Sequence, residues 1–86
     1  IRWSRQDLMR RLADLGLTPF PSQTNFLLTQ VPEEVDASTL YNQLKQKNIF
    51  VRYFNEESLR DKIRISIGSK KENDVLISSI KDILGK

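Results

Sequence analysis

The stretch Ile49–Ser69, IFVRYFNEESLRDKIRISIGS, decides the fold because it holds two strand-like runs that each carry one arginine among apolar residues. In the second run, polar residues alternate strictly with Ile63, Ile65 and Ile67. A period of two is typical of a strand that has one face in a core. We therefore expect Arg64 on the face opposite the isoleucines, outside their core.

The first run, IFVRYF, has the same period, so Arg52 shares a face with Phe50 and Phe54. If Val51 packs with the isoleucines, Arg52 and Arg64 emerge on the same side of one sheet. The planar fork of an arginine binds a carboxylate or a phosphate through two parallel hydrogen bonds. Two arginines flanked by aromatic rings therefore indicate an anion-recognition surface.

Composition narrows the classes of function. The length of 86 residues suits one small domain, and no apolar run is long enough to cross a membrane. The absence of cysteine excludes disulfides and cysteine-ligated metals, and the absence of histidine removes the commonest general base. The net charge of +3 is mild and mixed, which argues only weakly for nucleic acid. The chain starts without methionine on a helix-like pattern, so we interpret it as a piece of a longer protein.

The first helix is predicted to begin at Ser4, as its N-cap, and to end at Gly16, which adopts the left-handed conformation easily. Its apolar side, at three- and four-residue spacing, consists of Leu8, Leu12 and Leu15. The segment 17–22, LTPFPS, contains two prolines, so we expect it to run extended without regular pairing.

Two further helices are marked by polar caps. Asp36 is expected to cap a helix over 37–47 that stops at Asn48. Its apolar stripe contains Leu40 and Leu44. Ser69 and Glu72 have the spacing of a capping box at the start of the last helix. The apolar side of that helix is predicted to consist of Val75, Leu76, Ile80, Ile83 and Leu84.

A further strand is predicted over 25–31, NFLLTQV, although its mixed pattern leaves the buried face open. The element order is then α-β-α-β-β-α. The β-α-β unit should have parallel strands, and the last strand should run antiparallel, either beside its hairpin partner or between the other two. The predicted fold class is α+β, a two-layer sandwich with a small three-stranded mixed sheet and helices on one face. We expect another domain to lie against the uncovered face.

Arg64 and Arg52 are the candidate site residues, and each has two interpretations. Each is either a solvated arginine on an exposed sheet face or part of a bidentate clamp for a carboxylate or phosphate. Arg52 has a third interpretation, in which it only stacks on Phe50 or Phe54. Asn25 is either a turn residue that satisfies backbone groups or a residue that orients an arginine of a neighbouring strand.

No catalytic constellation is complete in this sequence. A Ser-His or Cys-His nucleophile is impossible, and no glycine-rich loop is present to cradle a phosphate. Aromatic residues on a sheet face are compatible with RNA binding, but the glycine–phenylalanine pattern of RNA-binding strands is missing. We therefore expect the chain to perform no catalysis by itself.

Three segments together resemble the histidinol-phosphate aminotransferases: PSQTNF at 21–26, NIFVR at 48–52, and IRISIGS at 63–69 followed by Glu72 and Asn73. The match follows the C-terminal small domain of that family over nearly the whole chain. The resemblance implies a pyridoxal-phosphate enzyme of the aspartate-aminotransferase fold, cytoplasmic and homodimeric. It implies transfer of an amino group between L-histidinol phosphate and 2-oxoglutarate in histidine biosynthesis.

The resemblance also implies roles for the candidate residues. Arg64 matches the arginine that grips the substrate α-carboxylate, Arg52 the one that helps to hold the phosphate or distal anionic group, and Asn25 an asparagine near the substrate end of the site. The partners implied are a phosphorylated amino substrate and 2-oxoglutarate or glutamate, with no nucleic acid and no membrane. Pyridoxal 5'-phosphate and the catalytic residues would belong to a large domain absent from residues 1–86, and no metal is implied.

Two alternatives stay open. Threonine-phosphate decarboxylase shares the fold and also recognises a phosphorylated amino substrate, although the run IRISIGS is closer to the aminotransferase. The alternative from another class is a free-standing α+β module that binds nucleic acid or a protein partner.

Overall fold

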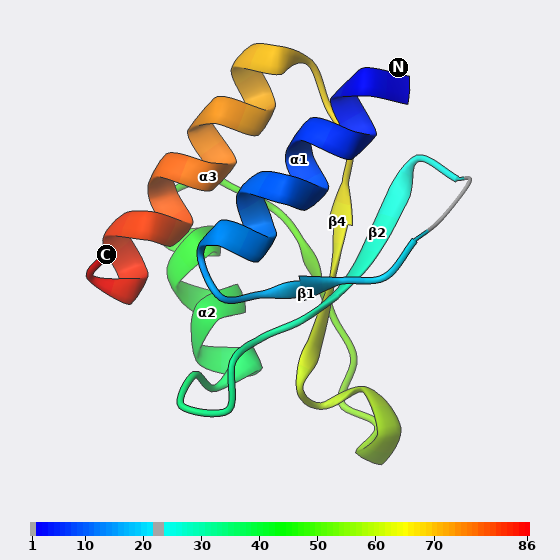
Figure 1. Cartoon of the computed structure of the whole chain (residues 1–86). Helices are drawn as coiled ribbons and strands as arrows, with labels where there is room; N and C mark the ends of the chain where they lie inside the picture. Colours follow the sequence, from blue (N-terminus) through cyan, green and yellow to red (C-terminus); the bar gives the residue numbers. More distant parts are fainter. Residues whose placement is uncertain (1, 22–23) are drawn as a thin grey trace.

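The computed structural model describes residues 2–21 and 24–86, and within these ranges it places three helices on one side of a four-stranded sheet (Figure 1). The helices are α1 (Arg2–Asp14), α2 (Ala37–Gln46) and α3 (Lys70–Leu84). The strands are β1 (Thr18–Pro19), β2 (Phe26–Gln30), β3 (Arg52–Tyr53) and β4 (Lys62–Ser66), with a short 3₁₀ helix, η1 (Glu57–Leu59), before β4. The α+β class and its two layers are therefore confirmed. None of the described helices combines the length and apolar character needed to cross a membrane.

The sheet has the strand order β1-β2-β4-β3, and every neighbouring pair is antiparallel. β4 thus lies between β2 and β3, which is one of the two positions expected for it. The prediction of a three-stranded mixed sheet is wrong, because Thr18–Pro19 adds β1 and the neighbours in the described sheet are all antiparallel. β1 is an edge strand, where a proline is tolerated, and the next amide, that of Phe20, donates to the carbonyl of Leu28 at 2.9 Å. Ser22, at the end of the segment expected to be unpaired, lies outside the described residues.

The alternation predicted for β4 is confirmed. Ile63 and Ile65 are at most 1% exposed, and they pair in register with Thr29 and Leu27 of β2, which are also buried. The register therefore shows that Leu27 and Thr29 form the buried face of β2, which the sequence alone did not determine. The alternate residues of these strands, Arg64 among them, lie on the face away from the core.

The helices bury apolar stripes against the sheet and one another. The buried apolar residues are Leu8 and Leu12 of α1 with Leu15 just after it, Ala37, Leu40 and Leu44 of α2, and Leu76, Ile77 and Ile80 of α3. The predicted stripe of α3 is wrong at Val75, which is 49% exposed, and Ile77 is buried instead. The reason is that α3 packs against α1 and α2 together, and this sets the rotation of the helix.

Most helix ends agree with their sequence signals. Asp36 caps α2, its carboxylate accepting from the amide of Thr39 at 3.1 Å. Asn48 and Gly16 both have left-handed backbones, with φ of 64° and 94°, as expected for residues that end helices. Ser4 is the exception. It lies inside the first turn of α1, which begins at Arg2, and is therefore not the N-cap.

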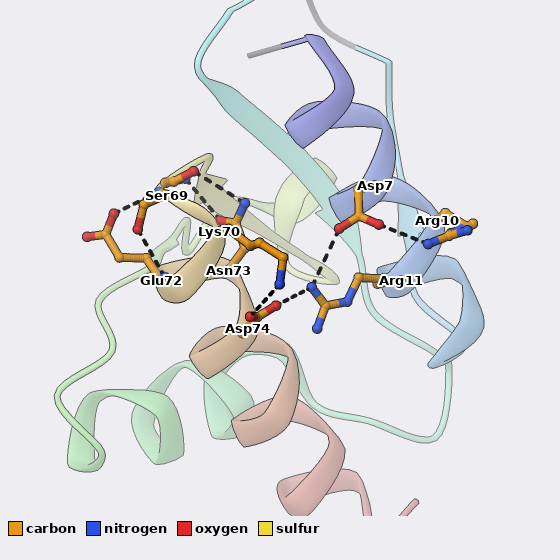
Figure 2. Close-up of polar contacts among 9 residues, drawn as sticks. Asp7, Arg10, Arg11, Ser69, Lys70, Glu72, Asn73 and Asp74 are labelled. Carbon is orange, nitrogen blue, oxygen red and sulfur yellow. Dashed lines mark hydrogen bonds and ion pairs between the residues drawn. The ribbon is translucent and has the colours of Figure 1, made fainter.

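Replacing Ser69 with alanine is expected to lower the free energy of unfolding by about 1 kcal/mol. The Ser69 hydroxyl accepts from the amide of Glu72 at 3.2 Å, and the Glu72 carboxylate accepts from the amide of Ser69 at 2.8 Å (Figure 2). The substitution removes the first of these bonds from the predicted capping box. Urea denaturation measures the change, with Ser78→Ala on the exposed side of α3 as the control. Equal stability of both variants would contradict the prediction.

Candidate functional site

The candidate site lies on the sheet face turned away from the helices, which we call the open face: Phe26, Leu28, Arg52, Phe54 and Arg64. Arg64 of β4 pairs in register with Leu28 on one side and with Arg52 on the other. Paired residues of antiparallel strands point to the same face of a sheet. The expectation that both arginines emerge on one side of the sheet is therefore confirmed.

The Arg64 guanidinium lies over two aromatic rings. Its central carbon is 4.5 Å from the centroid of Phe26 and 5.8 Å from that of Phe54. Within the described residues it has no carboxylate partner, so no acidic side chain of these ranges neutralises its charge. The side chain is half-buried, and its charge remains available to an external anion.

Arg52 is more exposed and lies 5.6 Å from the centroid of Phe54. Stacking of Arg52 on Phe54, one of its three interpretations, is thus present. Phe50, expected to flank the arginines, is 70% exposed and lines a different hollow, beside α3. Phe26 takes its place beside Arg64, because strand pairing brings β2 next to β4.

A shallow hollow of about 460 Å³ opens beside Arg64. Its lining is mostly apolar and consists of Phe20, Pro21, Thr24, Phe26, Leu28, Phe54, Leu59 and Arg64. Among the described residues of this lining, Arg64 is the one that carries a charge. A single arginine at the edge of an apolar hollow is suited to bind the anionic end of a small organic molecule.

Asn25 lies just before β2, and its carbonyl accepts from the amide of Ile67 at 2.8 Å. This bond extends the pairing of β2 with β4 by one step. In the alternation of β2, Asn25 falls with Leu27 and not with Phe26. The structure does not bring its side chain to either arginine by a hydrogen bond in the described ranges, so its orienting role stays a prediction.

Asn73 is a residue whose structural role the sequence did not reveal. It is 4% exposed, and its side chain makes two bonds with Gly68, accepting from the amide at 3.0 Å and donating to the carbonyl at 3.3 Å. These bonds hold the turn that joins β4 to α3 (Figure 2). An asparagine four residues after an N-cap was the available signal, but it does not predict burial.

Asp74, the neighbour of Asn73, joins α3 to α1. Its carboxylate accepts from the Arg11 guanidinium at 2.6 Å and from Lys70 at 3.3 Å, while Arg11 also lies 3.5 Å from Asp7 (Figure 2). The hydrogen bond from Arg11, followed by that from Lys70, lowers the pKa of Asp74 below its ordinary value. The contact fixes the helix layer and lies apart from the open face.

The stability of the chain is expected to fall as the pH drops from about 5 toward 2. Asp74 has a lower pKa folded than unfolded, so in this range the unfolded state binds more protons. Its contribution is therefore complete above the unfolded pKa and disappears as the pH falls through the folded one. Thermal melting between pH 7 and 2.5 measures the loss. Asp74→Asn should melt lower at pH 7 and depend less on pH, and an unchanged slope would contradict this assignment.

The described residues do not fit a pyridoxal phosphate site by themselves. Such a site needs a lysine for the Schiff base, and no lysine is among the described residues that line the hollow. Three lysines are engaged elsewhere: Lys62 with Asp61 at 2.8 Å, Lys70 with Asp74 at 3.3 Å, and Lys86 with the carbonyl of Leu15 at 2.7 Å. The described residues of the hollow support anion binding.

Comparison of the sequence with known protein families identifies the family of this chain. Residues 1–80 match the family described as aminotransferase class I and II. The chain belongs to this family. The expectation of aminotransferase ancestry is therefore confirmed over almost the whole chain.

Similar members of the family include histidinol-phosphate aminotransferase 1 of Nostoc sp., which is 42% identical over 84 residues, or 98% of this chain. The solved histidinol-phosphate aminotransferase of Sinorhizobium meliloti, in complex with pyridoxal-5'-phosphate, is 34% identical, with a TM-score of 0.82 over 95% of this chain and 23% of its own. L-threonine-O-3-phosphate decarboxylase of Porphyromonas gingivalis is 26% identical, with a TM-score of 0.83 over 99% of this chain and 28% of its own. The chain spans 24% of the length of the Nostoc relative.

Proposed function

We propose that this chain is the substrate-anchoring C-terminal domain of a histidinol-phosphate aminotransferase. The observation that carries the proposal is Arg64, a cation without a carboxylate partner in the described ranges, at the edge of an apolar hollow on the open face. The 42% identity to a histidinol-phosphate aminotransferase supports the choice of reaction. The complete protein would transfer an amino group between L-histidinol phosphate and 2-oxoglutarate.

The two arginines would divide the recognition of the substrates. Arg64 would hold the α-carboxylate of glutamate or 2-oxoglutarate through a bidentate pair, and Arg52 would help to hold the phosphate or the distal carboxylate. Asn25 would lie near the substrate end of the site. This division accounts for one site that accepts both a phosphorylated amine and a dicarboxylate.

The chemistry would depend on parts of the protein beyond these 86 residues. Pyridoxal phosphate supplies an electron sink for amino transfer, and its lysine and phosphate-binding groups would come from a large domain. The complete enzyme would be a cytoplasmic homodimer. Residues 1–86 alone should then be inactive.

The proposal is tested by mixing the full-length protein that contains this chain with histidinol phosphate and 2-oxoglutarate and measuring glutamate. Visible absorbance reports bound cofactor in the same sample. Stoichiometric glutamate is expected. A protein that carries the cofactor but forms no glutamate would overturn the proposed reaction.

Threonine-phosphate decarboxylase is a second candidate, favoured by the structural similarity to the Porphyromonas gingivalis enzyme. Both reactions use a phosphorylated amino compound, so the two arginines suit either. Carbon dioxide released from threonine phosphate, without glutamate from histidinol phosphate, would assign the protein to this second reaction.

Arg52→Ala in the full-length enzyme is expected to lower kcat/KM for histidinol phosphate more than for its dephosphorylated analogue histidinol. The difference should correspond to about 1.5–3 kcal/mol of transition-state stabilisation, since one charge-assisted contact is lost. Steady-state kinetics with both amines measures the difference. Arg60→Ala, which removes an exposed arginine just after η1, is the matched control. Equal losses for the two amines would count against a phosphate role for Arg52.

A further inference from the structure

In the described ranges, the Arg64 guanidinium contacts the rings of Phe26 and Phe54 and forms no ion pair with an acidic group. Where a carboxylate restrains an arginine side chain, it occupies the donors of the guanidinium and neutralises its charge. A ring face attracts the cation electrostatically but leaves the in-plane N–H groups unbonded. Arg64 therefore keeps its charge and its donor fork while its guanidinium is restrained.

We propose that Phe26 and Phe54 are positioning residues that hold the Arg64 guanidinium in a binding-ready orientation for a carboxylate. The proposal rests on the proposed function of Arg64 and adds the means by which its orientation is set. Phe26 makes the closer contact, at 4.5 Å against 5.8 Å, so it should carry most of the effect.

The backbone of Phe26 is fixed by strand pairing and by one hydrogen bond. Its residue pairs in register with Ser66 of β4, next but one to Arg64. Its amide donates to the Thr24 hydroxyl at 3.3 Å, and the carbonyl of Thr24 accepts from the Arg5 guanidinium of α1 at 2.9 Å. The backbone that carries the Phe26 ring is thus bonded to the sheet directly and, through Thr24, to α1.

Phe54 links the two arginines. Its ring centroid is 5.6 Å from the central guanidinium carbon of Arg52 and 5.8 Å from that of Arg64. Loss of the Phe54 ring should make both guanidinium groups more mobile, whereas loss of the Phe26 ring should affect Arg64 alone. Substitution of the two phenylalanines should therefore change the KM values of the two substrates differently.

The first test measures steady-state kinetics of the full-length aminotransferase. Phe26→Leu should raise KM for glutamate roughly three- to thirtyfold, the range expected when one cation–π contact is lost, with a smaller change in kcat. Phe26→Tyr keeps a ring face and should restore KM. Phe54→Leu should raise KM for both glutamate and histidinol phosphate. Phe50→Leu removes an exposed aromatic side chain from another hollow and is the control. Equal KM values in the Phe26 leucine and tyrosine variants would overturn the proposal.

The second test observes the Arg64 side chain directly in the nitrogen-15-labelled 86-residue chain by NMR. The Nε–H resonance should be displaced mainly by the ring current of Phe26, the nearer of the two rings, and it should move toward the random-coil position in Phe26→Leu but not in Phe26→Tyr. The backbone amide spectrum reports whether each variant is folded. An Arg64 resonance that is unchanged in a folded Phe26→Leu chain would contradict the positioning role.

The two tests separate this inference from the proposed function. Absence of glutamate formation by the cofactor-loaded full-length protein would refute the proposed reaction, while the Arg64 resonance would still decide whether the rings restrain the guanidinium. Normal amino transfer with unaltered KM and an unaltered resonance in Phe26→Leu would refute the positioning role alone.

Discussion

Replacing Arg64 with alanine in the full-length enzyme is expected to lower kcat/KM for amino transfer by about 2–5 kcal/mol, the cost of removing one partner of a hydrogen-bonded charge pair. The effect should be large because, in the described ranges, Arg64 is the one cation in the lining of the hollow. Its neighbour in the sheet, Arg52, is proposed to hold a different anionic group. The substrate carboxylate would then be left without its bidentate partner. Steady-state kinetics with glutamate measures the loss, and histidinol phosphate, which has no carboxylate, should lose less.

Two variants make the Arg64 result specific. Arg64→Lys keeps the charge but not the planar fork, so it should recover only part of the activity. Arg60→Ala removes an exposed arginine near η1 and should leave kcat/KM unchanged. Near-normal turnover by Arg64→Ala would refute the carboxylate assignment, because a bidentate anchor cannot be dispensable.

Leu27→Ala is expected to lower the free energy of unfolding by about 2–5 kcal/mol, the range for truncating a fully buried leucine. Leu27 is 0% exposed and pairs with Ile65 in the middle of the sheet, so the removed atoms leave a cavity between the sheet and the helices. A domain of this size has a stability of only about 5–15 kcal/mol, so the loss is a large part of the total. Urea denaturation at pH 7 measures it.

Leu28→Ala provides the matched control for Leu27→Ala, because the two leucines are consecutive in β2 and face opposite sides of the sheet. Leu28 lies half-buried on the open face, so its truncation leaves no enclosed cavity and should cost about 1 kcal/mol. Equal costs for the two variants would contradict the assignment of the buried and open faces.

Local signals in the sequence predicted much of the fold. The alternation around Arg64 predicted the faces of β4, and the polar caps Asp36 and Ser69 predicted the starts of α2 and α3. These predictions succeeded because each depends on residues within a few positions of one another. Ser4 failed as a cap because α1 begins earlier, at Arg2.

Predictions that depended on distant segments were less reliable. The pairing of Thr18–Pro19 with β2 and the burial of Ile77 in place of Val75 both depend on elements far away in the chain. The same is true of the candidate site. The sequence named Phe50 and Phe54 as the aromatic neighbours of the two arginines. Phe54 lies beside both, but Phe50 does not, and strand pairing brings Phe26 to Arg64 instead.

The sequence by itself determined the class of the fold, the ends of most helices and the side of the sheet on which Arg52 and Arg64 emerge. Side-chain periodicity and capping encode these features locally. Only the tertiary structure decided the strand order, the buried face of β2 and the rings that lie beside Arg64. Those features arise when residues some 40 positions apart, such as Phe26 and Arg64, meet through strand register, which no local pattern specifies.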